Sequence, residues 1–213
     1  MSAFRFGPDA GLPAGFAQCP TGTVLLRGHS PDRAPAWFGP AVGERGTNRF
    51  DLPFRGRTSD PGVCYLASTL DGVLLERVIR DARRDVLSLA TLRTRHAVTP
   101  VVTTRDLMLI DLLVAPWIRH GVQIGEMTAP PPYNPTQRLA ERLLSITPDG
   151  SPESPPAVPD GILYGSRFGA ATECLALWDR AASALVWQKT TPIGDENNAF
   201  ATTCSRLGIG LVP

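Results

Sequence analysis

The sequence is poor in lysine and carries almost no net charge. Lys189 is the only lysine among 21 basic residues, and 20 acidic residues bring the formal net charge to +1. Proteins that bind nucleic-acid backbones usually present an excess of basic side chains, which displace condensed counterions. Because this chain as a whole has no such excess, direct nucleic-acid binding is not expected.

The sequence also lacks the patterns of metal sites, secretion and membrane insertion. Its four cysteines are widely separated, with no CxxC pair or Cys/His cluster at metal-ligand spacing. The N-terminus has no basic start followed by an apolar run, and nowhere is there an apolar run of the roughly 18 residues needed to span a bilayer. We therefore expect a cytoplasmic protein with free thiols, no bound metal and no contact with a membrane.

The length and composition favour one folded domain over residues 1–213. The chain is 43% apolar and 19% charged, which is ordinary for a globular protein of this size. Residues 1–22 are rich in Gly and Pro and are predicted to form an N-terminal arm. Residues 147–160 are rich in Pro and are predicted to form a surface loop.

The pattern of apolar residues predicts an α+β domain. A helix is expected over Leu70–Arg84, whose apolar residues fall on one arc at about 100° per residue, with Thr69 or Asp71 as cap. A second helix is expected over Pro135–Ile146, capped by Asn134. A long loop rich in Pro and Gly covers Gly28–Asn48. Short apolar runs predict strands at Thr23–Arg27, Val63–Ala67, Leu107–Leu113, Gly161–Ser166, Leu175–Trp178 and Ala184–Lys189.

Four segments carry the chemistry that the sequence suggests. They are LLR at 25–27, NRFD at 48–51, GVCYLASTLDGVLLER at 62–77 and DGILYGSR at 160–167. Their order and spacing resemble the RES domain, a family named for functional Arg, Glu and Ser residues. The resemblance covers about residues 23–179, with weaker echoes at 105–112 and 133–140.

The resemblance implies a fold and an activity. RES proteins have an ADP-ribosyltransferase-like fold, with split, twisted β-sheets and flanking helices around an NAD+ cleft. Their known members are toxins of bacterial toxin–antitoxin pairs that degrade NAD+ by hydrolysis or phosphorolysis. Two alternatives remain open at this point: a mono-ADP-ribosyltransferase that modifies a protein target, and a catalytically inactive binding module. The chain after Asp179 matches poorly.

The resemblance also implies partners. An NAD+-degrading toxin needs a cognate antitoxin, typically a helix-turn-helix protein, although some proteins of this kind are delivered into rival cells as effectors. Homo- or hetero-oligomers are possible. NAD+ is the expected substrate, and the acceptor that attacks its ribose is left open.

The family's functional residues fall on five positions of this sequence. Glu76 would stabilise the positive charge that develops on the ribose as nicotinamide leaves. Arg27 and Arg49 would hold the pyrophosphate, for which a guanidinium offers paired donors. Tyr65 would stack on the nicotinamide ring, and the Ser166 hydroxyl would bond ribose or phosphate. Because nicotinamide leaves as a neutral group, no strong general acid is required.

Each of these positions also has a purely structural interpretation. Glu76 lies opposite the apolar arc and four residues before Arg80, which is typical of a solvated ion pair. The remaining alternatives are a surface charge for Arg27, a turn ion pair between Arg49 and Asp51, core packing for Tyr65, and backbone hydrogen bonds for Ser166. His29 is expected to be an exposed histidine without a catalytic role. Arg167 is expected either in the wall of the same cleft or in a surface pair.

Overall fold

The computed structural model describes residues 15–79, 86–113, 125, 127, 131–144, 158–194 and 197–213. Its strands are β1 (Phe16–Cys19), β2 (Val24–His29), β3 (Val63–Ala67), β4 (Val86–Ser88), β5 (Ala97–Thr103), β6 (Leu107–Asp111), β7 (Gly161–Ser166), β8 (Gly169–Trp178), β9 (Leu185–Trp187), β10 (Thr191–Pro192) and β11 (Gly210–Val212). Its helical segments are α1 (Leu70–Val73), the π-helical η1 (Leu74–Val78), α2 (Leu89–Arg95), α4 (Asn134–Leu143), the 3-10 helix η3 (Asp179–Ala184) and α5 (Asn197–Arg206).

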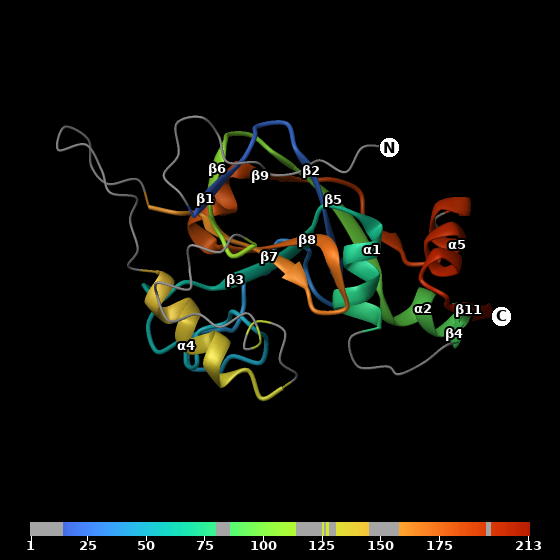
Figure 1. Cartoon of the computed structure of the whole chain (residues 1–213), viewed down its shortest axis with the longest axis horizontal. Coiled ribbons are helices and arrows are strands. Elements are labelled where there is room, and N and C mark those ends of the chain that lie inside the picture. The colour runs from blue at the N-terminus through green and yellow to red at the C-terminus, as the bar shows by residue number, and fades with distance from the viewer. Residues whose placement is uncertain are drawn as a thin grey trace.

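Nine strands of the described chain form one strongly curved sheet (Figure 1). The strand order is β1-β6-β7-β8-β3-β2-β5-β10, and β9 adds to β5. All neighbours are antiparallel except β6 and β7, which are parallel. A separate parallel pair is formed by β4 and β11. This mixture of a mainly antiparallel sheet with a few short helices confirms the α+β prediction.

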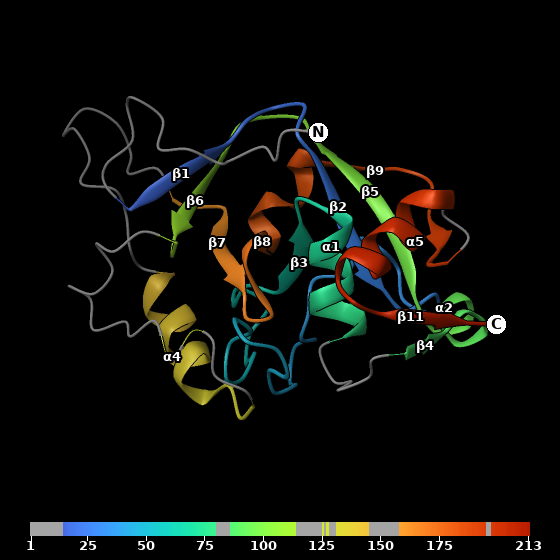
Figure 2. The same ribbon diagram turned by 45° about the vertical axis from the view of Figure 1, so that its right-hand side comes forward.

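The sheet divides between β2 and β3. Five residue pairs join β3 to β8, and six join β2 to β5, but only Leu26 and Ala67 pair between β2 and β3. Beyond that single pair the two strands diverge, and Figure 2 shows β2 and β5 leaning away from β3, β7 and β8. The short helix α1 contacts β2, β3 and β8 at this junction. The sheet is therefore split as the family resemblance implies, although its two halves remain joined at one point.

Side chains from opposite faces of the sheet feed two separate apolar clusters. Because successive residues of a strand point to opposite faces, Val63 and Ala67 of β3 join one cluster, while Cys64 and Leu66 join the other. The first cluster also takes in the helices of the α1 face, and the second is covered by η3. Burial on both faces holds β3 rigidly beside the split.

The helix predicted over Leu70–Arg84 begins where expected and then changes its hydrogen bonding. Thr69 caps it, because its hydroxyl oxygen accepts the Gly72 N–H at 3.3 Å. From Leu74 the backbone is π-helical, and the Ile79 N–H donates to the Leu74 carbonyl at 2.8 Å. Such single π turns are rare and are often found at functional sites. The expected continuation over residues 80–84 lies outside the described residues.

The connection from β2 to β3 is more ordered than its composition suggests. The predicted loop at 28–48 begins only after His29, and the connection from β2 to β3 is tied down by bridges between Gly39 and Val63 and between Arg45 and Phe54. The Arg55 guanidinium also donates to Pro40 O at 3.0 Å and to Asp179 at 2.9 Å. This long connection therefore has a defined course beside the split.

The N-terminal arm and the proline-rich loop are described only in part. Within the predicted arm over residues 1–22, Phe16–Cys19 form β1 and pair with β6, so this part belongs to the sheet. Residues 147–157 of the predicted loop lie outside the described residues. At the end of that loop, Asp160 is 5% exposed and accepts two hydrogen bonds from the Arg105 guanidinium, at 2.6 and 2.8 Å.

Helix α4 differs slightly from its prediction. Asn134 is its first helical residue, and Tyr133 is the N-cap, without a side-chain capping bond. The helix buries Leu139, Ala140 and Leu143 against the body. Its predicted last turn, up to Ile146, extends beyond the described residues. Among the described residues, no helix is long and apolar enough to span a membrane.

The C-terminal elements pack beside α1, at the right of Figure 1. Helix α5 contacts α1, and the Arg206 guanidinium forms a salt bridge with Asp71 of that helix. Strand β11 then pairs with β4. The last segment of the chain therefore supports the helix that leads into η1.

Candidate active site

A cleft opens where β2 and β3 diverge. It has a cavity volume of about 260 Å³ and is lined by residues of β2, β3, α1, η1 and the connection between β2 and β3, together with Tyr133 and Tyr164. Four of the five predicted site residues line it, namely Arg27, Arg49, Tyr65 and Glu76. The fifth, Ser166, contacts Glu76 from outside the lining. Residues far apart in the sequence thus converge at the split.

Glu76 lies in the π turn and is held by two polar neighbours. The Ser166 hydroxyl donates to its Oε1 at 2.7 Å, and Arg49 Nη2 lies 3.9 Å from its Oε2. The side chain of Glu76 is 22% exposed, so the carboxylate is accessible from the cleft but not freely solvated. Arg80, the partner in the alternative of a solvated ion pair, lies outside the described residues.

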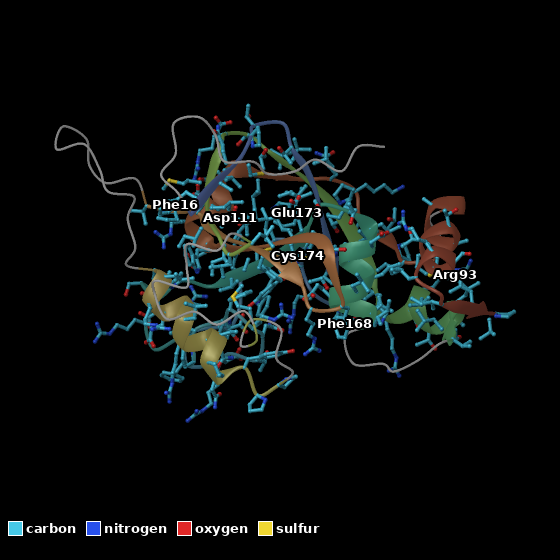
Figure 3. The ribbon with its side chains drawn as sticks, viewed as in Figure 1. Phe16, Arg93, Asp111, Phe168, Glu173 and Cys174 are labelled. Atoms are coloured by element: carbon cyan, nitrogen blue, oxygen red, sulfur yellow. The ribbon has the colours of Figure 1, made fainter. Side chains whose placement is uncertain are left out.

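Ser166 ends β7 and lies behind Glu76. The residue is 3% exposed, and its oxygen also accepts the Phe168 N–H at 3.3 Å. Phe168 lies at the turn that joins β7 to β8, as labelled in Figure 3. The hydroxyl therefore bonds the backbone of this turn, as the structural interpretation expects, and it also bonds the Glu76 carboxylate.

The NRFD turn separates the roles of its two charged residues. Asp51 accepts the N–H groups of Thr47 and Asn48 at 3.0 and 2.8 Å, so its carboxylate closes the turn. Arg49 points instead towards Glu76 and lies 5.4 Å from the centroid of the Tyr164 ring. Among the residues that the structure describes, its buried Nε has no hydrogen-bond acceptor. Arg49 thus keeps a donor that a ligand could use.

Tyr65 has a fully used hydroxyl and a ring that lines the cleft. The hydroxyl donates to Asp51 Oδ1 and accepts the Phe50 N–H, both at 2.9 Å. Burial, and then the adjacent Asp51 carboxylate, raise the pKa of Tyr65 well above its usual value. Burial also raises the pKa of Asp51. The phenol is therefore unsuited to proton transfer, and its ring is the part available to a ligand.

Gln137, which the sequence analysis did not identify, holds the NRFD turn in place. Gln137 of α4 is 6% exposed, and its side-chain amide donates to the carbonyls of Gly46 and Asn48 at 3.1 and 3.0 Å. A Cβ at Gly46 would lie only 2.2 Å from Leu52 O, so the close approach requires glycine. A signal was present in the YNPTQRLA echo, and in the helix Gln137 is buried together with Thr136, Leu139 and Ala140.

Arg27 is buried rather than exposed, contrary to the alternative of a surface charge. It is 5% exposed, its guanidinium donates to Cys64 Sγ, and it lies 5.8 Å from the centroid of the Trp187 ring. Burial raises the pKa of Cys64 to about 11, so the acceptor is a neutral thiol at neutral pH. Burial also lowers the pKa of Arg27, yet a guanidinium remains protonated in proteins. Within the described residues no carboxylate pairs with this charge.

His29 is also buried, so the expectation of an exposed histidine is wrong. Strand β2 continues two residues beyond Arg27 and pairs with β5, which brings the imidazole against that strand. Nδ1 lies 2.9 Å from Ser30 O, and Nε2 lies 2.7 Å from Thr99 Oγ1. Because a carbonyl only accepts, Nδ1 carries the proton and Nε2 accepts from Thr99 in the neutral ring. Burial, followed by the nearby Arg27, lowers the pKa of His29.

Arg167 packs against two aromatic rings. Its guanidinium carbon is 4.5 Å from the centroid of the Phe168 ring and 5.9 Å from that of Tyr133. Tyr133 lines the cleft, whereas Arg167 does not. The expected position in the wall of the cleft is therefore not found.

The cleft is lined by more positive than negative side chains, whereas the whole chain is nearly neutral. Its lining includes Arg27, Arg33, Arg49 and Arg77 but only one carboxylate, Glu76. Clustered guanidinium groups in a low-dielectric cleft attract anions and suit the oxygens of phosphates. In the ranges that the structure describes, no three His, Cys, Asp or Glu residues gather as a metal site would need.

The split sheet makes this an α+β domain with a cationic cleft between two half-sheets. The RES domain model matches residues 24–195, and the chain therefore belongs to the RES family. The matched region contains every candidate site residue and ends before α5.

The fold is also similar to a solved structure. The crystal structure of the M. tuberculosis MbcT–MbcA toxin–antitoxin complex contains a chain that aligns with a TM-score of 0.52 and 16% sequence identity. The alignment covers 90% of this chain and 91% of that one. A comparison with curated proteins gives no match. The similarity supports the RES fold over nearly the whole chain.

Proposed function

We propose that this protein is a RES toxin that degrades NAD+ by cleaving the bond between nicotinamide and ribose. Water or inorganic phosphate is the acceptor. The observation that carries the proposal is the convergence of Glu76, Arg27 and Arg49 on one cleft at the split of the sheet. These residues come from a π turn, a strand and a loop.

Glu76 is the proposed catalytic residue. As the bond from C1′ to the nicotinamide nitrogen breaks, both electrons leave with nicotinamide and positive charge develops on the ribose. A carboxylate fixed by Ser166 and Arg49 favours this state over the ground state, in which the positive charge lies on the nicotinamide ring. An oxygen of water or phosphate then bonds to C1′; water loses a proton to solvent in this step. Ser166 acts as a positioning residue, because its hydroxyl reaches Glu76 and not the cleft.

The guanidinium groups are proposed to bind the pyrophosphate. Arg27 lacks a carboxylate partner in the described chain, and Arg49 has an unused Nε–H. A buried charge without a counterion costs free energy, which an anionic ligand recovers. Tyr65 then presents its ring to the nicotinamide, while its hydroxyl remains bonded to Asp51.

A cognate antitoxin is proposed as the protein partner. The similar solved structure is a toxin–antitoxin complex, and an enzyme that depletes NAD+ would harm its own cell unless it were restrained. We propose an antitoxin of the helix-turn-helix type and a cytoplasmic site of action. Expression of the chain with and without the neighbouring open reading frames tests this: growth should stop without the antitoxin and recover with it.

The test of the activity is nicotinamide release from NAD+ by the purified protein, with and without phosphate. Glu76→Gln should abolish most of the release, because it removes the negative charge and keeps the shape. Glu141→Gln, an exposed residue of α4, is the matched control and should have no effect. Wild-type protein that releases no nicotinamide under either condition would contradict the proposal. Label transferred from NAD+ to a protein in cell lysate would instead indicate an ADP-ribosyltransferase.

A further inference from the structure

An arginine–tryptophan pair lines the mouth of the cleft and has no part in the chemistry described above. Arg33 and Trp37 both belong to the cleft lining, and the guanidinium carbon of Arg33 lies 4.1 Å from the centroid of the Trp37 ring. Arg33 is exposed and Trp37 is half-buried. A guanidinium at this distance over an indole ring makes a favourable cation–π contact.

The pair is held in place by the backbone. The Arg33 N–H donates to Ser30 O at 3.0 Å, and the Trp37 N–H donates to Ala34 O at 3.2 Å. The Trp37 ring also lies against Gly39, where an added Cβ would be 1.6 Å from Cη2. Because Gly39 bridges Val63, the indole is fixed relative to the first residue of β3.

The pair lies at the opposite end of the cleft from Glu76. Arg49, the neighbour of Glu76, lies next to Tyr164. Tyr164 is level with Ala67 across the sheet, because both pair with Cys174 of β8. Ala67 marks the closed end of the split. Trp37 is anchored at Val63, four residues away along β3. At about 3.3 Å per residue this places the two ends roughly 13 Å apart. That span suits a ligand with two ring systems separated by a charged linker.

We propose that Arg33 and Trp37 form the subsite for the adenosine end of the dinucleotide. This inference rests on the proposed function. With the nicotinamide ribose at Glu76 and the pyrophosphate at Arg27 and Arg49, the adenosine extends towards the mouth. Because the Arg33 guanidinium already lies over the indole, a purine would stack on the exposed side of that planar guanidinium, which Trp37 holds in place.

The subsite is tested by comparing two substrates that share the scissile bond. NAD+ carries the adenosine, whereas nicotinamide mononucleotide lacks it. Trp37→Ala removes the ring that holds the Arg33 guanidinium and should raise KM for NAD+ about tenfold, the loss expected for one stacked base. It should leave kcat/KM for nicotinamide mononucleotide within about twofold. Trp37→Phe should restore much of the affinity for NAD+, because a ring is again present.

The control is Phe54→Ala, which removes an exposed aromatic residue of the same connection that does not line the cleft. This variant should leave both substrates unaffected. Equal losses for both substrates with Trp37→Ala would overturn the subsite and indicate a structural role, and unchanged kinetics with NAD+ would overturn it as well.

A binding measurement separates this inference from the proposed function. If the wild-type protein does not cleave NAD+, titration with ADP-ribose still tests the subsite. Binding to the wild-type protein that weakens at least about fivefold in Trp37→Ala supports it. Equal binding to both proteins, or no binding to the wild-type protein, overturns it.

Discussion

The two sides of the cleft differ in how their polar groups are satisfied. On the side of β3 and η1, Glu76, Tyr65 and Asp51 all have partners within the protein, at 2.7–3.0 Å. On the side of β2, Arg27 is buried against a neutral thiol and an indole ring, without a carboxylate in the described chain. On the β3 side these three groups already have hydrogen-bond partners in the protein, whereas the β2 side has a charge that a ligand would compensate.

This difference suggests that the two sides of the cleft have different roles. Groups that stabilise a transition state work best when they are fixed before the substrate arrives, as on the β3 side. A buried guanidinium without a counterion is costly to the folded protein but adds affinity for an anion. Substitutions on the β3 side should therefore act mainly on turnover or stability, and those on the β2 side mainly on substrate binding.

The largest effect is expected at Arg27. Arg27→Met should raise KM for NAD+ about a hundredfold, since it removes a charged contact to the pyrophosphate worth ~3 kcal/mol. The same change should increase the free energy of unfolding by about 1 kcal/mol or more, because an uncompensated buried charge is replaced by an apolar chain. Steady-state kinetics and urea unfolding measure the two quantities. Arg45→Met, at an exposed position, is the control and should change neither quantity. An Arg27→Met variant that is less stable than the wild-type protein would show that the buried charge is not costly, and would refute the contrast between the two sides of the cleft.

A smaller effect is expected at Ser166. Ser166→Ala removes the hydrogen bond to Glu76 and should lower kcat about tenfold, a loss of about 1.4 kcal/mol, with KM changed less than about twofold. The KM is the deciding readout. A large increase in KM would show that the hydroxyl binds substrate, as the family resemblance implied. Ser166 would then act mainly on substrate binding, like the residues of the β2 side.

Tyr65 should affect stability more than activity. Tyr65→Phe keeps the ring but leaves Asp51 and the Phe50 N–H without the hydroxyl, at a cost of about 1–2 kcal/mol in the free energy of unfolding. Turnover of NAD+ should fall less than about threefold if the ring alone faces the substrate. Chemical denaturation and initial rates on the same preparation test both parts, and an unchanged stability would show that the hydrogen bonds contribute little.

The smallest effect concerns the pH dependence of stability through His29. Its pKa in the folded protein is lowered from 6.5 by burial, so folding favours the neutral ring. Its stabilising contribution is present above pH 6.5 and is lost as the pH falls towards the lower folded pKa. Between about pH 7 and pH 5 the wild-type protein should therefore lose up to about 1 kcal/mol more unfolding free energy than His29→Gln. Equal slopes in the two proteins would exclude this role.

The sequence predicted the strands best where both faces of the sheet bury them. Val63–Ala67 and Gly161–Ser166 have the predicted bounds, because short apolar runs bounded by Gly or Pro leave little freedom in their limits. Strand β1 was missed because the surrounding Gly and Pro residues outweighed a four-residue segment, FAQC, that includes a polar residue. The change from α to π at Leu74 depends on tertiary packing and has no signature in the apolar pattern.

The sequence predicted which residues form the candidate site, but not how they are arranged in space. The family motifs placed Glu76, Arg49 and Arg27 together, yet periodicity alone placed Glu76 on a solvated helix face. The burial of His29 and Arg27 follows from the extension of β2 along β5, a long-range pairing that no local window contains. The support from Gln137 likewise depends on how α4 packs against a turn about ninety residues earlier.

The single pairing of Leu26 with Ala67 has a mechanical consequence. Because β2 and β3 share no other backbone pair in the described chain, the spacing between the Arg27 and Glu76 sides depends on side-chain packing, including that of α1, which contacts both strands. The packing at this junction thus sets the distance between charged groups that lie further along the cleft.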